Sequence, residues 1–167
     1  EKTQKEIPNI ARGIKEGAKK LKSFGEPVSY QKQIDIKLLG VTIRGYTDFE
    51  FLNEQTGELF FIDLKTSSQL KKKVSFNHNC QTSIYNRATN TPQKVLYVRT
   101  SANPDSILLD AENDSKYIEY LERQIKAMNL LLEKCDKEEL KQLIVPNVDA
   151  FYWGEAETKA RKEVWGI

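Results

Sequence analysis

Two short aromatic stretches separated by a polar turn constrain this chain more than any other feature. They are Gly45–Phe51 and Phe60–Thr66, and both are rich in the aromatic and β-branched residues that favour strands. The polar run 53–57, Asn-Glu-Gln-Thr-Gly, lies between them and is typical of a turn. The sequence therefore predicts a β-hairpin with enough apolar side chains to lie inside a sheet.

Charged side chains interrupt this hairpin. Because side chains alternate between the two faces of a strand, Asp63 and Lys65 share one face, and a suitable register brings Asp48 beside Asp63. Two close carboxylates repel each other unless a cation lies between them, and the lysine adds a group that can stabilise charge or transfer a proton. The pattern predicts a metal site. The alternative is an ion-pair cluster on a solvated sheet face.

The length of 167 residues is typical of one domain with its own core. We expect a single domain over residues 1–167, with a core at about 8–110 and a helical C-terminal part at about 114–167. Hydrophobic residues make up 39% and charged residues 30%, which favours a globular protein over a disordered one. The net charge of +2 does not indicate a nucleic-acid binder by itself, so any basic surface must be local.

The two cysteines, Cys80 and Cys135, are far apart in sequence and form no CxxC pattern. An iron–sulfur cluster needs four thiolates, so it is excluded within one chain, and a reducing cytoplasmic compartment fits best. No stretch approaches the length of a membrane span, and the N-terminus is charged rather than signal-like. We therefore expect a cytoplasmic protein with no membrane partner.

Hydrophobic periodicity predicts the remaining elements. The first is a helix over about 8–22, with Pro8 in its first turn and Ile10, Ile14, Ala18 and Leu21 on the face that packs. Two strands joined by the turn Leu39-Gly40 precede Phe60–Thr66 and form an antiparallel meander with it. The further expected elements are a helix at 75–88, strands at 94–99 and 106–110, and helices at 114–134, 137–143 and 158–164. We expect an α/β (α+β) fold in which helices flank a central sheet.

Two further groups of residues leave alternatives open. Lys71, Lys72 and Lys73 form either a solvated loop or a phosphate contact, and Thr66 is either a turn residue or a second contact. The aromatic run 151–153 and Trp165 either pack on the core or stack on bases.

Three short motifs follow one another in the order Gly45-x-x-Asp48, Asp63-x-Lys65-Thr66 and Gln81-x-x-x-Tyr85. With the first two on paired strands and the third on the following helix, the chain resembles the PD-(D/E)XK nuclease superfamily, in particular its RecB-like branch, which includes phage exonucleases. The resemblance covers about residues 10–100. It implies a mixed sheet flanked by helices, which is a restriction-endonuclease-like core.

The same resemblance implies a site for one or two divalent metals, Mg²⁺ or Mn²⁺. Asp48, Asp63 and the backbone carbonyl of Leu64 would be ligands, and Lys65 would orient or help to deprotonate the attacking water. Hard divalent cations prefer such oxygen ligands and activate water. The resemblance also implies that Gln81 and Tyr85 shape the active site and contact DNA.

The resemblance further implies a metal ligand on the first helix, where many relatives carry histidine. Gly17 stands at that position here, and Glu16 is the nearest acidic substitute. The lone histidine, His78, precedes Gln81 by three residues. Because no second histidine can join it, we expect a surface or structural role for His78 rather than metal ligation.

The resulting hypothesis is a metal-dependent DNA nuclease that hydrolyses phosphodiester bonds, an exonuclease of a phage or mobile-element system for recombination or DNA degradation. A phage-encoded enzyme would act in the host cytoplasm. Its partners would be DNA, with a recombination protein or helicase as a separate chain, and a homo-oligomer is a further option. One alternative is a catalytically weak nucleic-acid-binding domain of the same fold. Another is a restriction-type endonuclease, although no recognition helix is evident.

Overall fold

The structure, a computed structural model, describes residues 2–144, 147 and 154–166, with side chains from residue 6 onward. The aromatic run 151–153 lies outside the described residues. The chain forms two compact units, Glu1–Glu122 and Arg123–Ile167. The expectation of one domain over residues 1–167 stays a prediction.

The first unit is built on a five-stranded mixed sheet with the strand order β1-β2-β3-β4-β5. Its strands are β1 (Ser29–Leu38), β2 (Val41–Leu52), β3 (Leu59–Ser67), β4 (Gln93–Arg99) and β5 (Asp105–Asp110). Only β3 and β4 are parallel, and every other neighbouring pair is antiparallel. The predicted α+β fold, its mixed sheet and its antiparallel meander of β1, β2 and β3 are thus confirmed.

Local turn chemistry explains how the meander forms. Leu39 and Gly40 both have positive φ, at 49° and 81°, as a tight two-residue hairpin turn between β1 and β2 requires. Between β2 and β3, the Asn53 side chain accepts hydrogen bonds from the backbone N–H groups of Gln55 and Thr56, and Gly57 has a φ of 71°. Both predicted turns are confirmed, so the register of the two hairpins is fixed by their turn residues.

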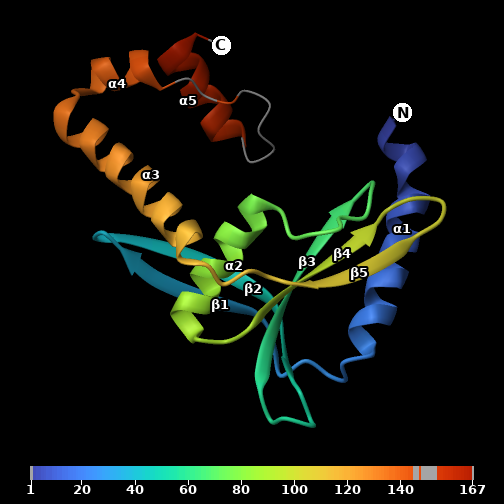
Figure 1. The fold of residues 1–167 in the computed structure, drawn as a ribbon. Helices are drawn as coiled ribbons and strands as arrows, with labels where there is room; N and C mark the ends of the chain where they lie inside the picture. Colours follow the sequence, from blue (N-terminus) through green and yellow to red (C-terminus); the bar gives the residue numbers. More distant parts are fainter. Residues whose placement is uncertain (1, 145–146, 148–153, 167) are drawn as a thin grey trace. The chain divides into compact units, whose positions relative to one another are not determined.

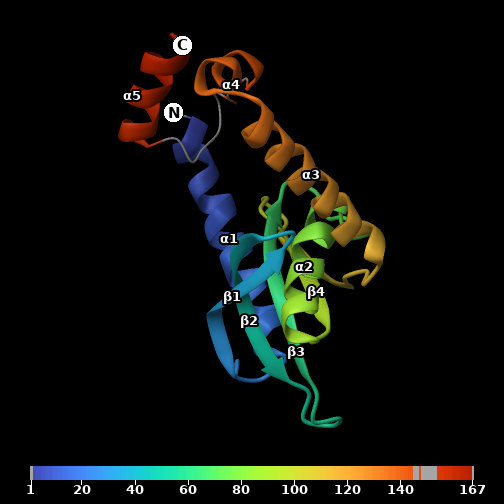
Figure 2. The same ribbon diagram turned by 90° about the vertical axis from the view of Figure 1, so that its left-hand side faces the viewer.

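Helices cover the two faces of this sheet (Figures 1 and 2). Helix α1 (Lys2–Lys22) lies on one side and α2 (Phe76–Thr89) on the other. The face toward α1 carries an apolar cluster of Phe51, Ile62, Leu96 and Val98. Side chains alternate along a strand, so the side chains of Asp63 and Lys65 lie on the opposite face, as do those of Val95 and Tyr97.

The predicted packing of the first helix is wrong for Ile10, Ile14 and Ala18, which are exposed, and right for Leu21, which packs against the apolar cluster. Helix α1 begins at Lys2, so Pro8 lies inside it. Its buried positions are Gly13 and Gly17, which let the helix approach the sheet closely. A Cβ atom on Gly13 would lie 2.7 Å from a methyl carbon of Thr100. The backbone of α1 therefore takes the place that larger side chains were expected to fill.

The second unit is helical. It contains the second half of α3 (Ser115–Lys134), together with α4 (Lys137–Leu143) and α5 (Glu155–Trp165). A capping box between Asp136 and Glu139 starts α4, and the indole N–H of Trp165 donates to the carbonyl of Lys141 at 2.9 Å. All three predicted helices are present. Among the described helices, none has the length and apolar character needed to cross a bilayer.

Candidate active site

The sheet splits at the point where the predicted carboxylates lie. The ladder between β2 and β3 runs from Leu52 opposite Leu59 to Phe49 opposite Ile62, and it ends there. Beyond this point β2 continues beside β1 alone, whereas β3 continues beside β4. Figure 1 shows the two ribbons diverging next to α2. The next position of each strand at this fork is Asp48 on β2 and Asp63 on β3.

The fork leaves backbone groups of Leu64 without a strand partner on β2. The N–H of Phe61 donates to the carbonyl of Pro92, on the β4 side, so by alternation the N–H and C=O of Leu64 both point toward β2. The N–H of Leu64 donates to Oδ2 of Asp48 at 2.7 Å. The Leu64 carbonyl faces the same gap. Two of the three predicted metal ligands, Asp48 and the Leu64 carbonyl, are thus brought to one place.

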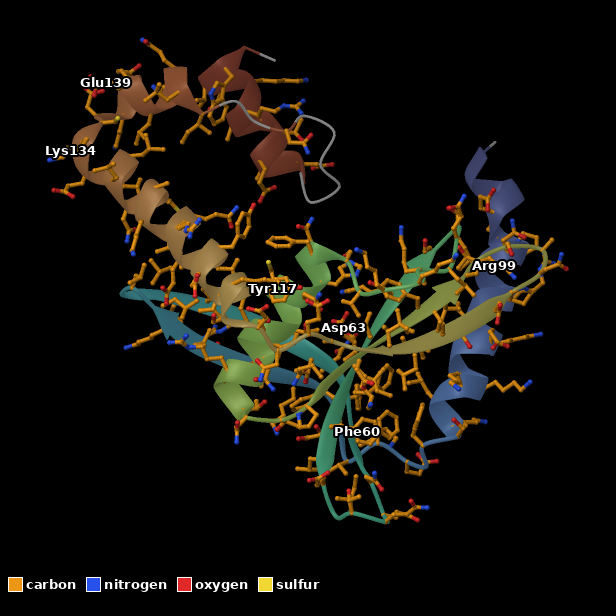
Figure 3. All side chains as sticks on the ribbon, viewed as in Figure 1. Phe60, Asp63, Arg99, Tyr117, Lys134 and Glu139 are labelled. Atoms are coloured by element: carbon orange, nitrogen blue, oxygen red, sulfur yellow. The ribbon has the colours of Figure 1, made fainter. Side chains whose placement is uncertain are left out.

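Asp63 is buried in the middle of the unit, on the α2 side of β3 (Figure 3), with 3% of its surface exposed. Its Oδ1 accepts a hydrogen bond from Nε2 of Gln81 at 3.2 Å, and its Oδ2 lies 2.9 Å from Nζ of Lys65. Among the described residues, Lys65 is the charged partner of this buried oxygen, and no further group donates a hydrogen bond to it. A carboxylate oxygen with a single partner can still accept from, or bind, a further group.

Electrostatics agree with this geometry. Burial raises the pKa of Asp63 above its usual value, Lys65 opposes this effect, and the negative charge of Asp48 raises the pKa further. The two carboxylates are therefore close enough to interact unfavourably. A divalent cation between them would remove this repulsion and satisfy Oδ2, and carboxylate and carbonyl oxygens are its preferred ligands. The donor set at the fork thus fits Mg²⁺ or Mn²⁺.

Among the described residues, the carboxylates at the fork are those of Asp48 and Asp63. Within the part of the chain that the structure describes, no group of three or more His, Cys, Asp and Glu side chains forms a metal-binding cluster. A nearby acidic residue, Glu50, is 4% exposed, but its carboxylate already accepts from the hydroxyl of Ser29 at 2.6 Å and pairs with Nζ of Lys32 at 3.2 Å. Glu50 is thus engaged in holding β1 to β2.

The QxxxY residues of α2 form a hydrogen-bonded chain from Asp63 to β2. Nε2 of Gln81 lies 3.1 Å from the hydroxyl of Tyr85, which donates to the backbone carbonyl of Tyr46 at 3.0 Å. The Tyr85 ring lies against Gly45, where a Cβ atom would stand 2.7 Å from Cε1. This contact gives a physical reason for the glycine in Gly45-x-x-Asp48, and the chain fixes β2 relative to β3 at the fork.

The first-helix residues do not join this group. Glu16 accepts a hydrogen bond from the hydroxyl of Ser106 at 2.7 Å, and a Cβ atom on Gly17 would lie 3.2 Å from Val98. Ser106 is the register partner of Val98, so both contacts are made on the sheet face opposite Asp63. The structure therefore places Glu16 two strands away from β3 and on the far face.

The predicted phosphate contacts lie between β3 and α2. Lys71, Lys72 and Lys73 are exposed, as is Thr66, which follows Lys65 on β3. Exposure leaves these residues available to a ligand. Their role stays a prediction.

Sequence reasoning missed the surroundings of His78. This ring lies next to Tyr97, whose hydroxyl is 2.6 Å from Nδ1, and Tyr97 is the register partner of Lys65. The signal was present in the sequence, since residues three positions apart lie on the same side of a helix and His78 precedes Gln81 by three. The register that places Tyr97 beside Lys65 comes from the long-range pairing of β3 with β4, for which local sequence patterns carry no signal.

Comparisons with known proteins were made at the level of sequence and of fold. The sequence profile of the PD-(D/E)XK nuclease superfamily matches residues 1–163. No curated protein sequence gives a significant match. Among solved structures, the crystal structure of a "Putative exonuclease" from Eubacterium rectale is similar, with a TM-score of 0.56 and 14% identity over 76% of this chain and 53% of that chain.

A second solved structure, a protein named SSO0001, aligns with a TM-score of 0.46 and 17% identity over 78% of this chain and 65% of its own. The present chain thus spans about half the length of the Eubacterium rectale protein and less than two thirds of SSO0001. At 14% identity, the TM-score of 0.56 with the Eubacterium rectale protein supports the fold alone.

Proposed function

The chain belongs to the PD-(D/E)XK nuclease superfamily, and on this premise we propose that it is a divalent-metal-dependent deoxyribonuclease with its active site at the fork between β2 and β3. The observation that carries the proposal is the buried, charged surroundings of Asp63. Its carboxylate is buried, one of its oxygens has Lys65 as its partner with no further donor among the described residues, and the negative charge of Asp48 acts on it.

A merely structural ion pair would not explain this arrangement. Burying a carboxylate beside a like charge costs free energy, and replacing a whole buried ion pair by well-packed apolar residues is often neutral or stabilising, so stability alone does not account for the pair. By contrast, the exposed pair Arg44 and Asp35 is bidentate, with distances of 2.8 and 2.9 Å, and both partners are satisfied. The strained pair lies at the fork, where a metal-binding nuclease needs it.

Each residue at the fork has a distinct role in the proposal. Asp48, Asp63 and the carbonyl of Leu64 hold the cation, which when bound supplies Lewis-acid stabilisation of the phosphoryl charge and lowers the pKa of the attacking water. Lys65, with a quarter of its side chain exposed, orients the water and offsets negative charge on the phosphate. Gln81 holds the Asp63 carboxylate in place, and Tyr85 ties the helix to β2.

We propose further that the enzyme is an exonuclease of a phage or mobile-element system. This part rests on the resemblance of the three motifs to the RecB-like branch and on the name of the Eubacterium rectale protein. A recombination protein or helicase as a separate chain, and a homo-oligomer, belong to the same proposal.

The test is digestion of end-labelled linear DNA and of covalently closed circular DNA, with Mg²⁺, with Mn²⁺ and with EDTA. We expect loss of linear DNA only with metal. The variants Asp63→Asn and Lys65→Ala should each lower the rate by at least about 100-fold. The matched control is Asp110→Asn, because Asp110 pairs with Lys94 on the exposed edge of the sheet and should leave the rate unchanged.

The possible results separate the alternatives. Cleavage of closed circles would make the enzyme an endonuclease, and DNA binding without turnover in either metal would make it a nucleic-acid-binding domain. Wild-type rates in Asp63→Asn or Lys65→Ala would refute the site itself. The urea midpoint of each variant is measured beside that of wild type, and a folded variant with a cooperative transition shows that its loss of activity does not come from loss of the fold.

A further inference from the structure

The imidazole of His78 is held in one orientation by buried groups. Its Nδ1 lies 2.6 Å from the hydroxyl of Tyr97, which is 1% exposed, and the two rings are 5.6 Å apart at 31°. The same hydroxyl accepts a hydrogen bond from the backbone N–H of Ser75, the N-cap of α2, at 3.3 Å. The His78 side chain is thereby fixed against both the sheet and the start of the helix.

These contacts also determine which nitrogen carries the proton. The Tyr97 hydroxyl has a single hydrogen, and among the described residues Nδ1 of His78 is its one acceptor. Because a donating Nδ1 would leave the hydrogen of this buried hydroxyl without an acceptor, we assign Tyr97 as the donor to Nδ1, which places the hydrogen of a neutral imidazole on Nε2. Burial, and after it the positive charges of Lys65 and Lys71, lower the pKa of His78 and favour this neutral form. Across the described part of the chain, no group accepts from Nε2.

The location of His78 connects it to the fork. It lies one turn before Gln81 on α2, and Gln81 contacts Asp63. Its partner Tyr97 lies beside Lys65 in the sheet, on the same face as Asp63. The remaining charged groups that act on the ring are the ammonium groups of Lys65 and Lys71. A fixed N–H donor next to two cations suits an anionic ligand that only accepts hydrogen bonds, and a phosphodiester is such a ligand.

We propose that His78 is a substrate-contacting residue of the nuclease proposed above, and that its Nε2–H donates to a phosphate oxygen of the bound strand. Tyr97 is then a positioning residue, because it holds the imidazole in the tautomer that can donate. This role differs from metal ligation, for which a deprotonated Nε2 would be needed.

The test compares Ala, Asn and Gln at position 78. The amide of His78→Asn reaches the place of Nδ1 and can keep the bond to Tyr97, whereas the amide nitrogen of His78→Gln reaches the place of Nε2. The readouts are the Kd for a fluorescein-labelled oligothymidylate in EDTA, by anisotropy, and the urea midpoint. EDTA removes turnover, so the binding result stands whether or not the chain cleaves DNA.

If His78 contacts phosphate, His78→Ala and His78→Asn should raise the Kd about 5- to 10-fold, and His78→Gln should stay within about 3-fold of wild type. In the cleavage assay the same loss should appear in KM more than in kcat. A structural role predicts the reverse order, with Asn near wild type in both readouts and Gln impaired. That order, or an unchanged Kd in His78→Ala, would overturn the inference. A competition arm adds inorganic phosphate to the same anisotropy assay. The inference would also be overturned if substitutions at position 78 changed the affinity for inorganic phosphate but left the Kd of the oligonucleotide unchanged.

Discussion

The contact between Gly45 and Tyr85 predicts that replacing this glycine by alanine lowers the stability, which is the reverse of the usual effect in a strand. Substitution of alanine for glycine in a strand interior normally stabilises a protein by about 0.5–1 kcal/mol, because glycine loses more backbone entropy on folding. Gly45 has no positive φ, so its backbone accepts alanine without strain. On backbone grounds alone, Gly45→Ala should therefore raise the stability.

The structure predicts the opposite. A Cβ atom on residue 45 would lie 2.7 Å from Cε1, 2.9 Å from the hydroxyl oxygen and 3.2 Å from Cζ of Tyr85. Tyr85 is 5% exposed and cannot move away without breaking its bonds to the Tyr46 carbonyl and to Gln81. Overpacking of this kind costs about 1–3 kcal/mol, and each broken hydrogen bond about 1 kcal/mol more. After the entropic gain is subtracted, we expect a net loss of about 1–3 kcal/mol.

A double-mutant cycle in urea measures this effect. The four proteins are wild type, Gly45→Ala, Tyr85→Ala and the double variant. Without the ring, the substitution at position 45 should be neutral or stabilising, so the coupling energy should be about 2–3 kcal/mol. Because a displaced ring also releases Gln81 from its second partner, Gly45→Ala should lower nuclease activity as well. A free energy of unfolding for Gly45→Ala equal to or above that of wild type would refute this account of the fork.

Two further predictions concern α1 and His78. Gly17→His should lower the free energy of unfolding by about 2–4 kcal/mol, since the imidazole would be pressed against Val98; calorimetric titration with Mn²⁺ should show unchanged affinity, and a gain in affinity would contradict the placement of α1. The pKa of His78 is lowered by burial and then by Lys65 and Lys71, so its neutral form stabilises the fold fully above about pH 6.5, and this contribution is lost as the pH falls through the lowered folded-state pKa. The urea midpoint of wild type should thus fall relative to that of His78→Asn between neutral and acidic pH, and a constant difference between the two would count against a lowered pKa.

The sequence carries enough information for the elements of this fold and for the order of its first three strands. Period-two patterns and turn residues such as Leu39-Gly40 and Asn53 act locally, so the meander and the nearness of Asp48 to Asp63 follow from short-range chemistry. The order strand, helix, strand favours a parallel pair of β3 and β4, but no local pattern sets the register of that pair. The contact of Tyr97 with His78 depends on this register, so the sequence analysis did not predict it.

The failure on α1 has a different physical origin. The stripe of Ile10 and Ile14 reads as a core face because apolar burial dominates stability, yet the structure buries the side with Gly13 and Gly17. At these two glycines the helix backbone packs directly against β4, so no large side chain is buried between them. A search for regularly spaced apolar residues does not detect packing of this kind.

This close approach also bears on the missing first-helix ligand. With Gly17 packed against Val98 and Glu16 bonded to Ser106, α1 supports the sheet from the face opposite the carboxylates. On the side that faces α2, the amide of Gln81 donates a hydrogen bond to Asp63. His78, one turn earlier on α2, contacts the hydroxyl of Tyr97 on the same face of the sheet. In the proposed site the groups that would face substrate come from one helix and two strands, so we expect activity to tolerate changes in Glu16 that leave α1 folded. Glu16→Gln keeps a hydrogen-bond acceptor for Ser106 and removes the charge, and its rate in Mg²⁺ should stay within about 3-fold of wild type. A loss of 100-fold would mean that α1 approaches the metal in the working enzyme.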